Sequence, residues 1–244
     1  MMKDTLRTGL TVLSLSLVGC SGSGDEDDGA SESLCANIEA IDPTALIDDM
    51  EDRNASIVMA GARTGGWWSA GDDTAGATIV PALGEEALPE LIPGGRCGSQ
   101  YAMRVTGQGF ADWGSLIGLN LAYDSAGGAF YDASAYEGVS FWARVGDTST
   151  NQMRFAITDQ NSEPKGGKCV EDGGAGVECF DSFGITINAL ETTWKRYEVP
   201  FSGLGERNFG LHADALDTSA LYVVGFNVEP NSIFDLWVDD VSFY

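Results

Sequence analysis

The sequence predicts an all-β protein, an antiparallel two-sheet sandwich of the jelly-roll type. Short runs that alternate between apolar and polar residues recur along the chain, and glycine-rich turn signals separate them. Helical periodicity is nearly absent, and only residues 43–49 and 214–220 suggest a turn of helix. About ten such strands without a repeat period are typical of this sandwich architecture.

The strands are predicted from alternation and from bounding turns. Residues 138–145 alternate most clearly, because Val139, Phe141 and Val145 fall on one side and Trp142 and Arg144 on the other. In chain order, the predicted strands cover residues 47–52, 56–60, 65–68, 77–81, 101–106, 115–122, 138–145, 152–158, 183–188, 194–199, 222–228 and 234–244.

The last strand carries an unusual acidic pair, Asp239-Asp240, among apolar residues. A buried carboxylate is costly unless it is paired or binds a metal. Near the start of the folded region lies a second acidic run, residues 48–52. We therefore expect the first and last strands to lie near each other and to share a cation. Strict alternation predicts two sides for the last strand, with one made of Phe234, Leu236 and Val238 and the other of Trp237, Asp239, Val241 and Phe243.

Composition excludes some partners. The chain has a net charge of −24, and nucleic acids and anionic lipid surfaces bind clustered Lys and Arg. Apolar residues make up 43% of the sequence, which is enough for a real core. So much acid favours cation binding or solubility.

The first residues are typical of an export signal. A basic start is followed by a short apolar run over residues 8–18, too short to span a membrane. Leu17-Val18-Gly19-Cys20 resembles the bacterial lipoprotein box, which implies cleavage before Cys20, lipidation of Cys20 and a location at the outer membrane or cell surface, since Ser21 is not Asp. An ordinary signal peptide is the alternative. The predicted organisation is a signal peptide over 1–19, a lipidated cysteine with a flexible acidic linker over 20–34, and a β-sandwich domain over 35–244.

Four further cysteines allow three disulfide pairings in an exported chain. Cys169 and Cys179 flank a glycine-rich loop that closes easily, which leaves Cys35 to pair with Cys97. A zinc site is the competing interpretation, but the chain lacks a Cys-x-x-Cys spacing and has a single histidine, His212.

Several segments together carry a resemblance to a known family. They are the acidic first strand, Gly-Trp-Trp at residues 66–68, Arg-Val-Thr-Gly-Gln-Gly-Phe-Ala-Asp-Trp-Gly at 104–114, Val-Ser-Phe-Trp-Ala-Arg at 139–144, Trp-Lys-Arg-Tyr-Glu-Val-Pro-Phe-Ser at 194–202 and Leu-Trp-Val-Asp-Asp-Val-Ser-Phe at 236–243. The chain resembles the galactose-binding-like jelly-roll superfamily over residues 41–244. Within it, the chain is most similar to family 11 carbohydrate-binding modules and the complex I intermediate-associated protein group.

This resemblance implies one structural calcium ion between the first and last strands. Glu51 and Asp239 match the ligand positions, and Asp49 is a further candidate. Calcium takes six to eight oxygen ligands, so these side chains supply only part of the shell. The alternative is that Asp239 accepts hydrogen bonds at a strand edge while Glu51 is solvated.

The resemblance also implies a carbohydrate or glycan ligand. Flat aromatic rings stack on sugars, and polar side chains on the non-core side of a strand bind hydroxyl groups. The candidate ligand-binding residues are Trp68, Trp113, Asn120, Trp142, Arg144, Gln152, Arg154 and Asn227. The alternative for each tryptophan is core packing.

We therefore expect a non-catalytic carbohydrate-binding module at the cell surface. A structural or protein-interaction lipoprotein on the same fold is the second hypothesis, and buried tryptophans would favour it. A polysaccharide-degrading enzyme is the third. No catalytic residues are assigned, because His212 stands alone and no Gly-x-Ser-x-Gly elbow, His-Glu-x-x-His helix or phosphate loop occurs in the sequence.

Overall fold

The computed structural model describes residue 35 and residues 41–244. The chain divides into two units, residues 1–38 and 39–244, and the second unit contains the two sheets. Within the described residues no helix is both long and apolar enough to cross a membrane. The export signal, Cys20 and the acidic linker lie outside the described residues.

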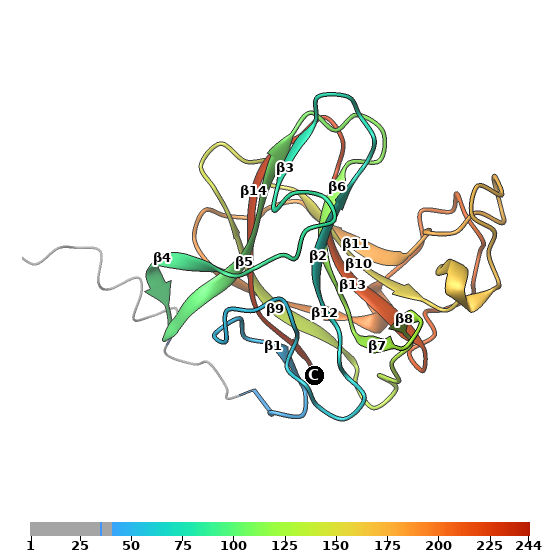
Figure 1. Cartoon of the computed structure of the whole chain (residues 1–244), viewed down its shortest axis with the longest axis horizontal. Coiled ribbons are helices and arrows are strands. Elements are labelled where there is room, and N and C mark those ends of the chain that lie inside the picture. Colours follow the sequence, from blue (N-terminus) through green and yellow to red (C-terminus); the bar gives the residue numbers. More distant parts are fainter. Residues whose placement is uncertain (1–34, 36–40) are drawn as a thin grey trace, which may run out of the picture. The chain divides into compact units, whose positions relative to one another are not determined.

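Two antiparallel sheets face each other, as predicted for a jelly-roll sandwich (Figure 1). The seven-stranded sheet has the order β12-β9-β14-β5-β3, with β1 paired to β14 and β4 paired to β5. Its strands are β1 (Leu46–Asp48), β3 (Thr78–Val80), β4 (Glu90–Arg96), β5 (Ser99–Gln108), β9 (Gly138–Val145), β12 (Lys195–Pro200) and β14 (Ile233–Phe243).

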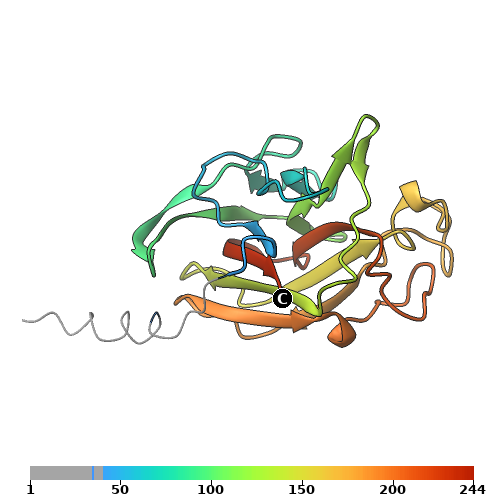
Figure 2. The same ribbon diagram turned by 90° about the horizontal axis from the view of Figure 1, so that it is seen from below.

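The five-stranded sheet has the order β11-β10-β13-β6-β2. Its strands are β2 (Gly66–Gly71), β6 (Ser115–Asn120), β10 (Met153–Asp159), β11 (Phe183–Ile187) and β13 (Leu221–Val228). A separate hairpin, β7 (Ala122–Asp124) with β8 (Gly127–Ala129), projects from the sandwich (Figure 2).

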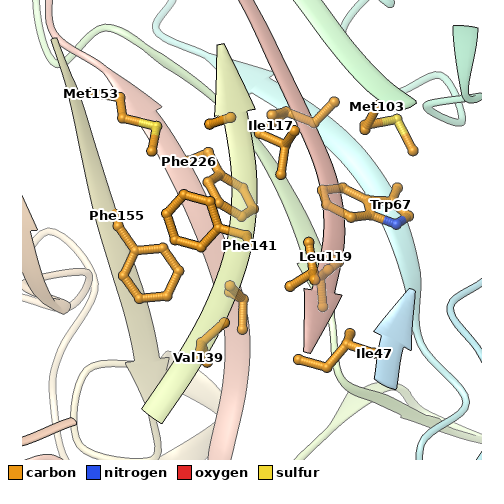
Figure 3. Close-up of a cluster of buried hydrophobic side chains, with 14 of the residues drawn as sticks. Ile47, Trp67, Met103, Ile117, Leu119, Val139, Phe141, Met153, Phe155 and Phe226 are labelled. Atoms are coloured by element: carbon orange, nitrogen blue, oxygen red, sulfur yellow. The ribbon is translucent and has the colours of Figure 1, made fainter. Parts of the chain in front are cut away.

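The core lies between the two sheets (Figure 3). Phe141 of the seven-stranded sheet packs against Phe155 and Phe226 of the five-stranded sheet, at ring-centroid distances of 5.2 and 5.0 Å. All three side chains are fully buried, and burial of each such ring stabilises the fold by about 1.5–3 kcal/mol. The inner residues of the two sheets therefore hold the layers together, and the other side of each sheet is available for other roles.

A β-bulge in β14 corrects the predicted sides of the last strand. Asp239 is paired with Trp142 and Ser242 with Ser140, so β14 has one residue more than β9 at this point. Asp240 takes a φ of 44°, in the left-handed region. The bulge reverses the alternation, so Val241 and Phe243 face the core together with the earlier inward residues. The prediction that Val241 and Phe243 lie on the side of Trp237 and Asp239 was therefore wrong.

Most predicted strands are confirmed, with three differences. Residues 56–60 form only isolated bridges, and residues 43–49 and 214–220 form no helix. The prediction missed β4 and the β7–β8 hairpin. Strand β4 contains Pro93 followed by Gly94 and Gly95, both at positive φ, and this composition is typical of a loop.

The Cys169–Cys179 disulfide is confirmed, and it closes the long connection between β10 and β11. Cys35 and Cys97 are each disulfide-bonded as well. Their pairing with one another stays a prediction.

Candidate functional site

A strip of small residues crosses the outer face of the five-stranded sheet. Strand registers place Trp68 beside Gly118, Gly118 beside Gly225, Gly225 beside Ala156 and Ala156 beside Gly184. We call Gly118, Gly225, Ala156 and Gly184 the small-residue strip. Across five strands this row spans roughly 19 Å, because neighbouring strands lie about 4.8 Å apart. No residue of the strip carries a large side chain, but all four are buried, because Leu116 lies against Gly118 and Arg154 lies over Gly184.

Trp68 lies at the β2 end of the strip. Its indole nitrogen donates to Asn120 Oδ1 at 2.8 Å, and Asn120 is on the neighbouring strand β6. The Tyr123 hydroxyl, which is on β7, lies 3.5 Å from the same oxygen. The strand register and this hydrogen bond therefore bring two of the predicted ligand residues, Trp68 and Asn120, together on one face.

Arg154 lies at the β11 end. Its Nη2 donates to the carbonyl oxygens of Ser182 and Gly205 at 3.2 and 2.7 Å. A Cβ built on Gly184 would lie 2.9 Å from Arg154 Cζ, so the guanidinium lies over the glycine. Burial lowers the pKa of Arg154, yet the group stays a cation because arginine has an intrinsic pKa above 12. Its Nε and Nη1 make no hydrogen bond to any part of the chain that the structure describes.

Asn227 and Gln152 flank this end of the strip. Asn227 is beside Arg154 in the register, and its Nδ2 donates to the Arg154 carbonyl oxygen at 3.0 Å. Gln152 precedes β10 and is exposed. The five-stranded sheet thus carries five of the predicted ligand residues, namely Trp68, Asn120, Gln152, Arg154 and Asn227.

Trp142 and Arg144 lie on the other sheet, on the side away from the core. Trp142 is 5% exposed and clusters with Trp194 and Trp237. Arg144 Cζ lies 5.3 Å from the ring of Trp194 and 4.7 Å from the ring of Trp237. We call these three tryptophans, with Arg96, Arg104 and Arg144, the tryptophan–arginine face. Trp142 and Arg144 therefore do not join the other predicted ligand residues, and the buried ring of Trp142 has no surface for a ligand.

Trp113 stands in the loop between β5 and β6 and is 49% exposed. Asp72 fixes this loop, because its Oδ2 accepts hydrogen bonds from the backbone of Asp112 and Gly114, both at 2.9 Å. Trp113 has no contact with the small-residue strip among the described interactions, so the two remain separate features.

The acidic residues of the first and last strands are close, as predicted, but Ser99 connects Glu51 to Asp239, and a protein cation, Arg96, binds Asp239 and Asp240. Arg96 Nε lies 2.9 Å from Asp239 Oδ2, and Arg96 Nη2 lies 2.5 Å from Asp240 Oδ2. The Ser99 hydroxyl lies 2.8 Å from Asp239 Oδ2 and 3.1 Å from Glu51 Oε1. These contacts join β4, β5, β14 and the loop after β1.

Glu51 and Asp49 are also occupied by the protein. Glu51 Oε1 accepts from the backbone amides of Gln100 and Tyr101, at 2.7 and 3.0 Å. Asp49 Oδ1 accepts from the backbone amide of Glu51 at 3.2 Å. Within residues 41–244 no group of three Asp, Glu, His or Cys residues is arranged to hold a metal ion. Asp49, Glu51 and Asp239 therefore do not fit the implied calcium site.

Two buried carboxyl groups of this region have perturbed pKa values. Burial raises the pKa of Asp48 to about 7, although hydrogen bonds from the Met50 amide and the Trp67 indole oppose the shift. Burial also raises the pKa of Asp239 to about 7, against the attraction of Arg96. Asp48 has no basic partner in the described structure and Asp239 does.

The prediction missed three residues of interest. Arg96 lies on β4, the strand hidden by Pro93 and the two glycines after it. Tyr123 and Tyr222 add aromatic surface near Asn120. The Tyr123 hydroxyl contacts Asn120. Tyr222 comes directly after Leu221, whose side chain is buried in the core, so Tyr222 points to the outer side of β13. In the sequence, a tyrosine at the end of an alternating strand is the pattern that could have indicated these two residues.

Comparison with solved structures identifies the fold. A family 11 carbohydrate-binding module from Clostridium thermocellum, in complex with a β-1,3-1,4-mixed-linked tetrasaccharide, has a TM-score of 0.50 and 19% identity, over 82% of this chain and 94% of the module. A family 30 carbohydrate-binding module has a TM-score of 0.51 and 16% identity, over 81% of this chain and 98% of the module. No family model matches the sequence, and no curated protein matches it. The architecture predicted from strand patterns is therefore confirmed: this chain has the antiparallel two-sheet jelly-roll fold of these carbohydrate-binding modules.

Proposed function

We propose that this protein binds a polysaccharide or glycan along the small-residue strip, without acting on it chemically. The observation that carries the proposal is the strip itself, which crosses four strands with Trp68 of β2 at one end and the Arg154 guanidinium at the other. An extended sugar chain needs a path of this kind, with a ring to stack on and donors that reach its hydroxyl groups. The mixed-linked tetrasaccharide bound by the family 11 module makes a β-glucan the first ligand to test.

The chemistry of the flanking groups supports this ligand class. Asn227 Oδ1 and Arg154 Nε and Nη1 have no hydrogen-bond partner in the described part of the chain, so they are free for a ligand. Asn120 orients the Trp68 ring through the indole nitrogen, which leaves the ring without rotational freedom to lose on binding. A preorganised ring and a few free polar groups are typical of binding surfaces for small polar ligands.

The proposal also includes the anchor. We infer that lipidation of Cys20 holds the protein in the bacterial outer membrane and that the acidic linker separates the sandwich from the lipid. The lipoprotein box at residues 17–20 supports this inference. Labelled palmitate should be incorporated by a bacterial host into the unaltered chain and not into Cys20→Ser. Equal labelling of both chains would exclude the anchor.

Affinity electrophoresis tests the ligand. The purified protein should migrate more slowly in gels that contain mixed-linkage β-glucan or another soluble polysaccharide. Gly225→Val should remove the retardation, because its side chain would stand in the middle of the strip. A Cβ at Gly225 meets its nearest atoms at 3.4 Å or more, which is ordinary van der Waals contact, and a thermal melt of the variant checks that valine is accommodated.

Thr78→Val is the matched control. Thr78 is exposed on β3, in the other sheet, so this change also adds a valine to a strand surface while leaving the strip intact. Thr78→Val should migrate like the unaltered protein. Absence of retardation on every polysaccharide of a glycan panel would exclude the proposed function and favour a structural lipoprotein.

A further inference from the structure

Arg96 binds Asp239, the last-strand carboxylate to which the resemblance assigns a calcium ion. Its side chain is 1% exposed, and Nη2 lies 2.8 Å from Asp239 Oδ2 and 2.5 Å from Asp240 Oδ2. One guanidinium thus pairs with both carboxyl groups of the acidic pair in the last strand. Charge-assisted pairs of this kind are among the strongest hydrogen bonds in proteins.

Two tryptophans hold the guanidinium in place. Arg96 Cζ lies 4.6 Å from the ring of Trp142 and 5.7 Å from the ring of Trp194. The rings cover the flat side of the group while the carboxylates bind its edge, and both contacts favour the cation. Calcium binds oxygen ligands and not aromatic rings, so this environment suits an arginine and not a calcium ion.

The same cluster carries out the fastening that a shared metal would provide. Ser99 connects Asp239 to Glu51, and Glu51 binds the backbone of β5 through the amides of Gln100 and Tyr101. Arg96 adds β4 to this connection. The loop after β1 is therefore joined to β5, and β4 and β5 are joined to β14, through protein groups alone.

We infer that Arg96 replaces the structural cation in this chain, so that the fold is independent of calcium and depends on a positive charge at residue 96. The guanidinium belongs to the chain itself, so it cannot be removed by chelation or by a fall in calcium concentration. The inference does not depend on the proposed carbohydrate ligand.

Thermal unfolding of the unaltered protein is the first test. The melting temperature should be the same in millimolar calcium as in excess chelator. A calcium ion that binds the folded state alone would raise the melting temperature as its concentration rises. Such a rise in the unaltered protein would overturn the inference.

Substitutions at residue 96 form the second test. Arg96→Met keeps an apolar stem against Trp142 but leaves two carboxylates without a cation, and it should lower the melting temperature by about 10 °C or more. Arg96→Lys restores a positive charge and should recover part of this loss. Equal melting temperatures for the two variants would show that packing, and not charge, matters at residue 96, and would overturn the inference.

Arg104→Met is the matched control. Arg104 also lies on a tryptophan, 4.7 Å from the Trp237 ring, and it also pairs with two acids, Glu90 and Asp235. Its side chain is 31% exposed, so water screens the pair and Arg104→Met should lower the melting temperature by only a few degrees. A failure of Arg96→Met to fold, while Arg104→Met folds, is the extreme form of the expected loss. A loss no larger than that of Arg104→Met would contradict the inference.

Discussion

Both sheets carry tryptophan and arginine on the side away from the core, but they use these residues differently. On the seven-stranded sheet, Trp142, Trp194 and Trp237 are each at most 9% exposed, and arginines stack on them. On the five-stranded sheet, the same side carries glycine and alanine at its centre, with Trp68 and Arg154 at the ends. Large side chains of its own cover the first face, while the centre of the second carries only small residues, which lie buried among neighbouring side chains such as Leu116 and Arg154.

The difference separates a face that is packed with its own large side chains from the face to which we assign the proposed ligand. On the tryptophan–arginine face, strand register brings Arg104, Trp237 and Arg144 side by side, so each cation finds a ring within the protein. On the outer face of the five-stranded sheet, the register aligns residues without large side chains, so Trp68 and Arg154 are kept apart. Three substitutions test this contrast and a fourth, at Asp48, tests a buried carboxyl group on β1 of the seven-stranded sheet; they follow from the largest expected effect to the smallest.

Trp237→Ala should cause the largest loss of stability. Trp237 is 4% exposed and contacts Arg104 and Arg144, both at 4.7 Å. Removal of a buried tryptophan costs about 3–5 kcal/mol. Urea unfolding measures the loss, and polysaccharide retardation of the folded fraction should not change. A cost below about 1 kcal/mol would show that this face is not a packed cluster.

Asp48→Asn should change the pH dependence of stability. The folded-state pKa of Asp48 is about 7, above the unfolded value of 3.8, so the folded protein prefers the protonated form. Its contribution is fully present below pH 3.8 and is lost as the pH rises toward 7, by up to about 4 kcal/mol. Asn stays neutral, so urea unfolding between pH 4 and pH 8 should be flatter for the variant. If the pH dependence of the unfolding free energy were the same for the variant and the unaltered protein, the raised pKa of Asp48 would be wrong.

Trp68→Ala should separate binding from stability. Trp68 is only half-buried, so the loss of stability should be about 1–2 kcal/mol, well below that for Trp237→Ala. Polysaccharide affinity should fall at least tenfold, which corresponds to about 1.4 kcal/mol. Isothermal titration with the retarding polysaccharide measures the affinity. An unchanged affinity would show that Trp68 does not contact the polysaccharide, and the proposed difference between the two faces would then be wrong.

Arg144→Met should have the smallest effect, within about 1 kcal/mol. Arg144 Nε is buried without a hydrogen-bond partner, and burial lowers the pKa of the group, so its charge contributes little to stability. Methionine keeps apolar contact with Trp194 and Trp237, and replacement of an unsatisfied polar group by an apolar one of similar shape is nearly neutral. Urea unfolding gives the measurement, and a loss above about 2 kcal/mol would show that cation–ring contact dominates this face.

Alternation of residues predicted the fold class and most strands because one side of each strand faces a single shared core. It also showed that Trp142 and Arg144 share a side, and this is confirmed. Alternation does not say which sheet a strand joins, because that depends on pairing between distant segments. Trp142 and Arg144 were therefore grouped with ligand residues that lie on the opposite sheet.

The candidate acidic site was predicted in its location and not in its chemistry. The first and last strands do meet near Asp239, as the two acidic runs indicate. Arg96, the cation that binds Asp239, could not be predicted from the sequence. It follows Pro93-Gly94-Gly95, a segment with the composition of a turn. Its 143-residue separation from Asp239 also hides the pair from any local pattern.

The bulge at Asp239–Asp240 has a consequence for comparing this chain with its relatives. One extra residue shifts the alternation of the strand by one position, so every later side chain points to the opposite side of the sheet from the one that strict alternation predicts. A relative that lacks the extra residue matches this chain residue by residue up to Asp239 and is out of phase from Val241 onward. An alignment without a gap there would equate core residues of one protein with surface residues of the other, so relatives should be aligned on strand register in this segment.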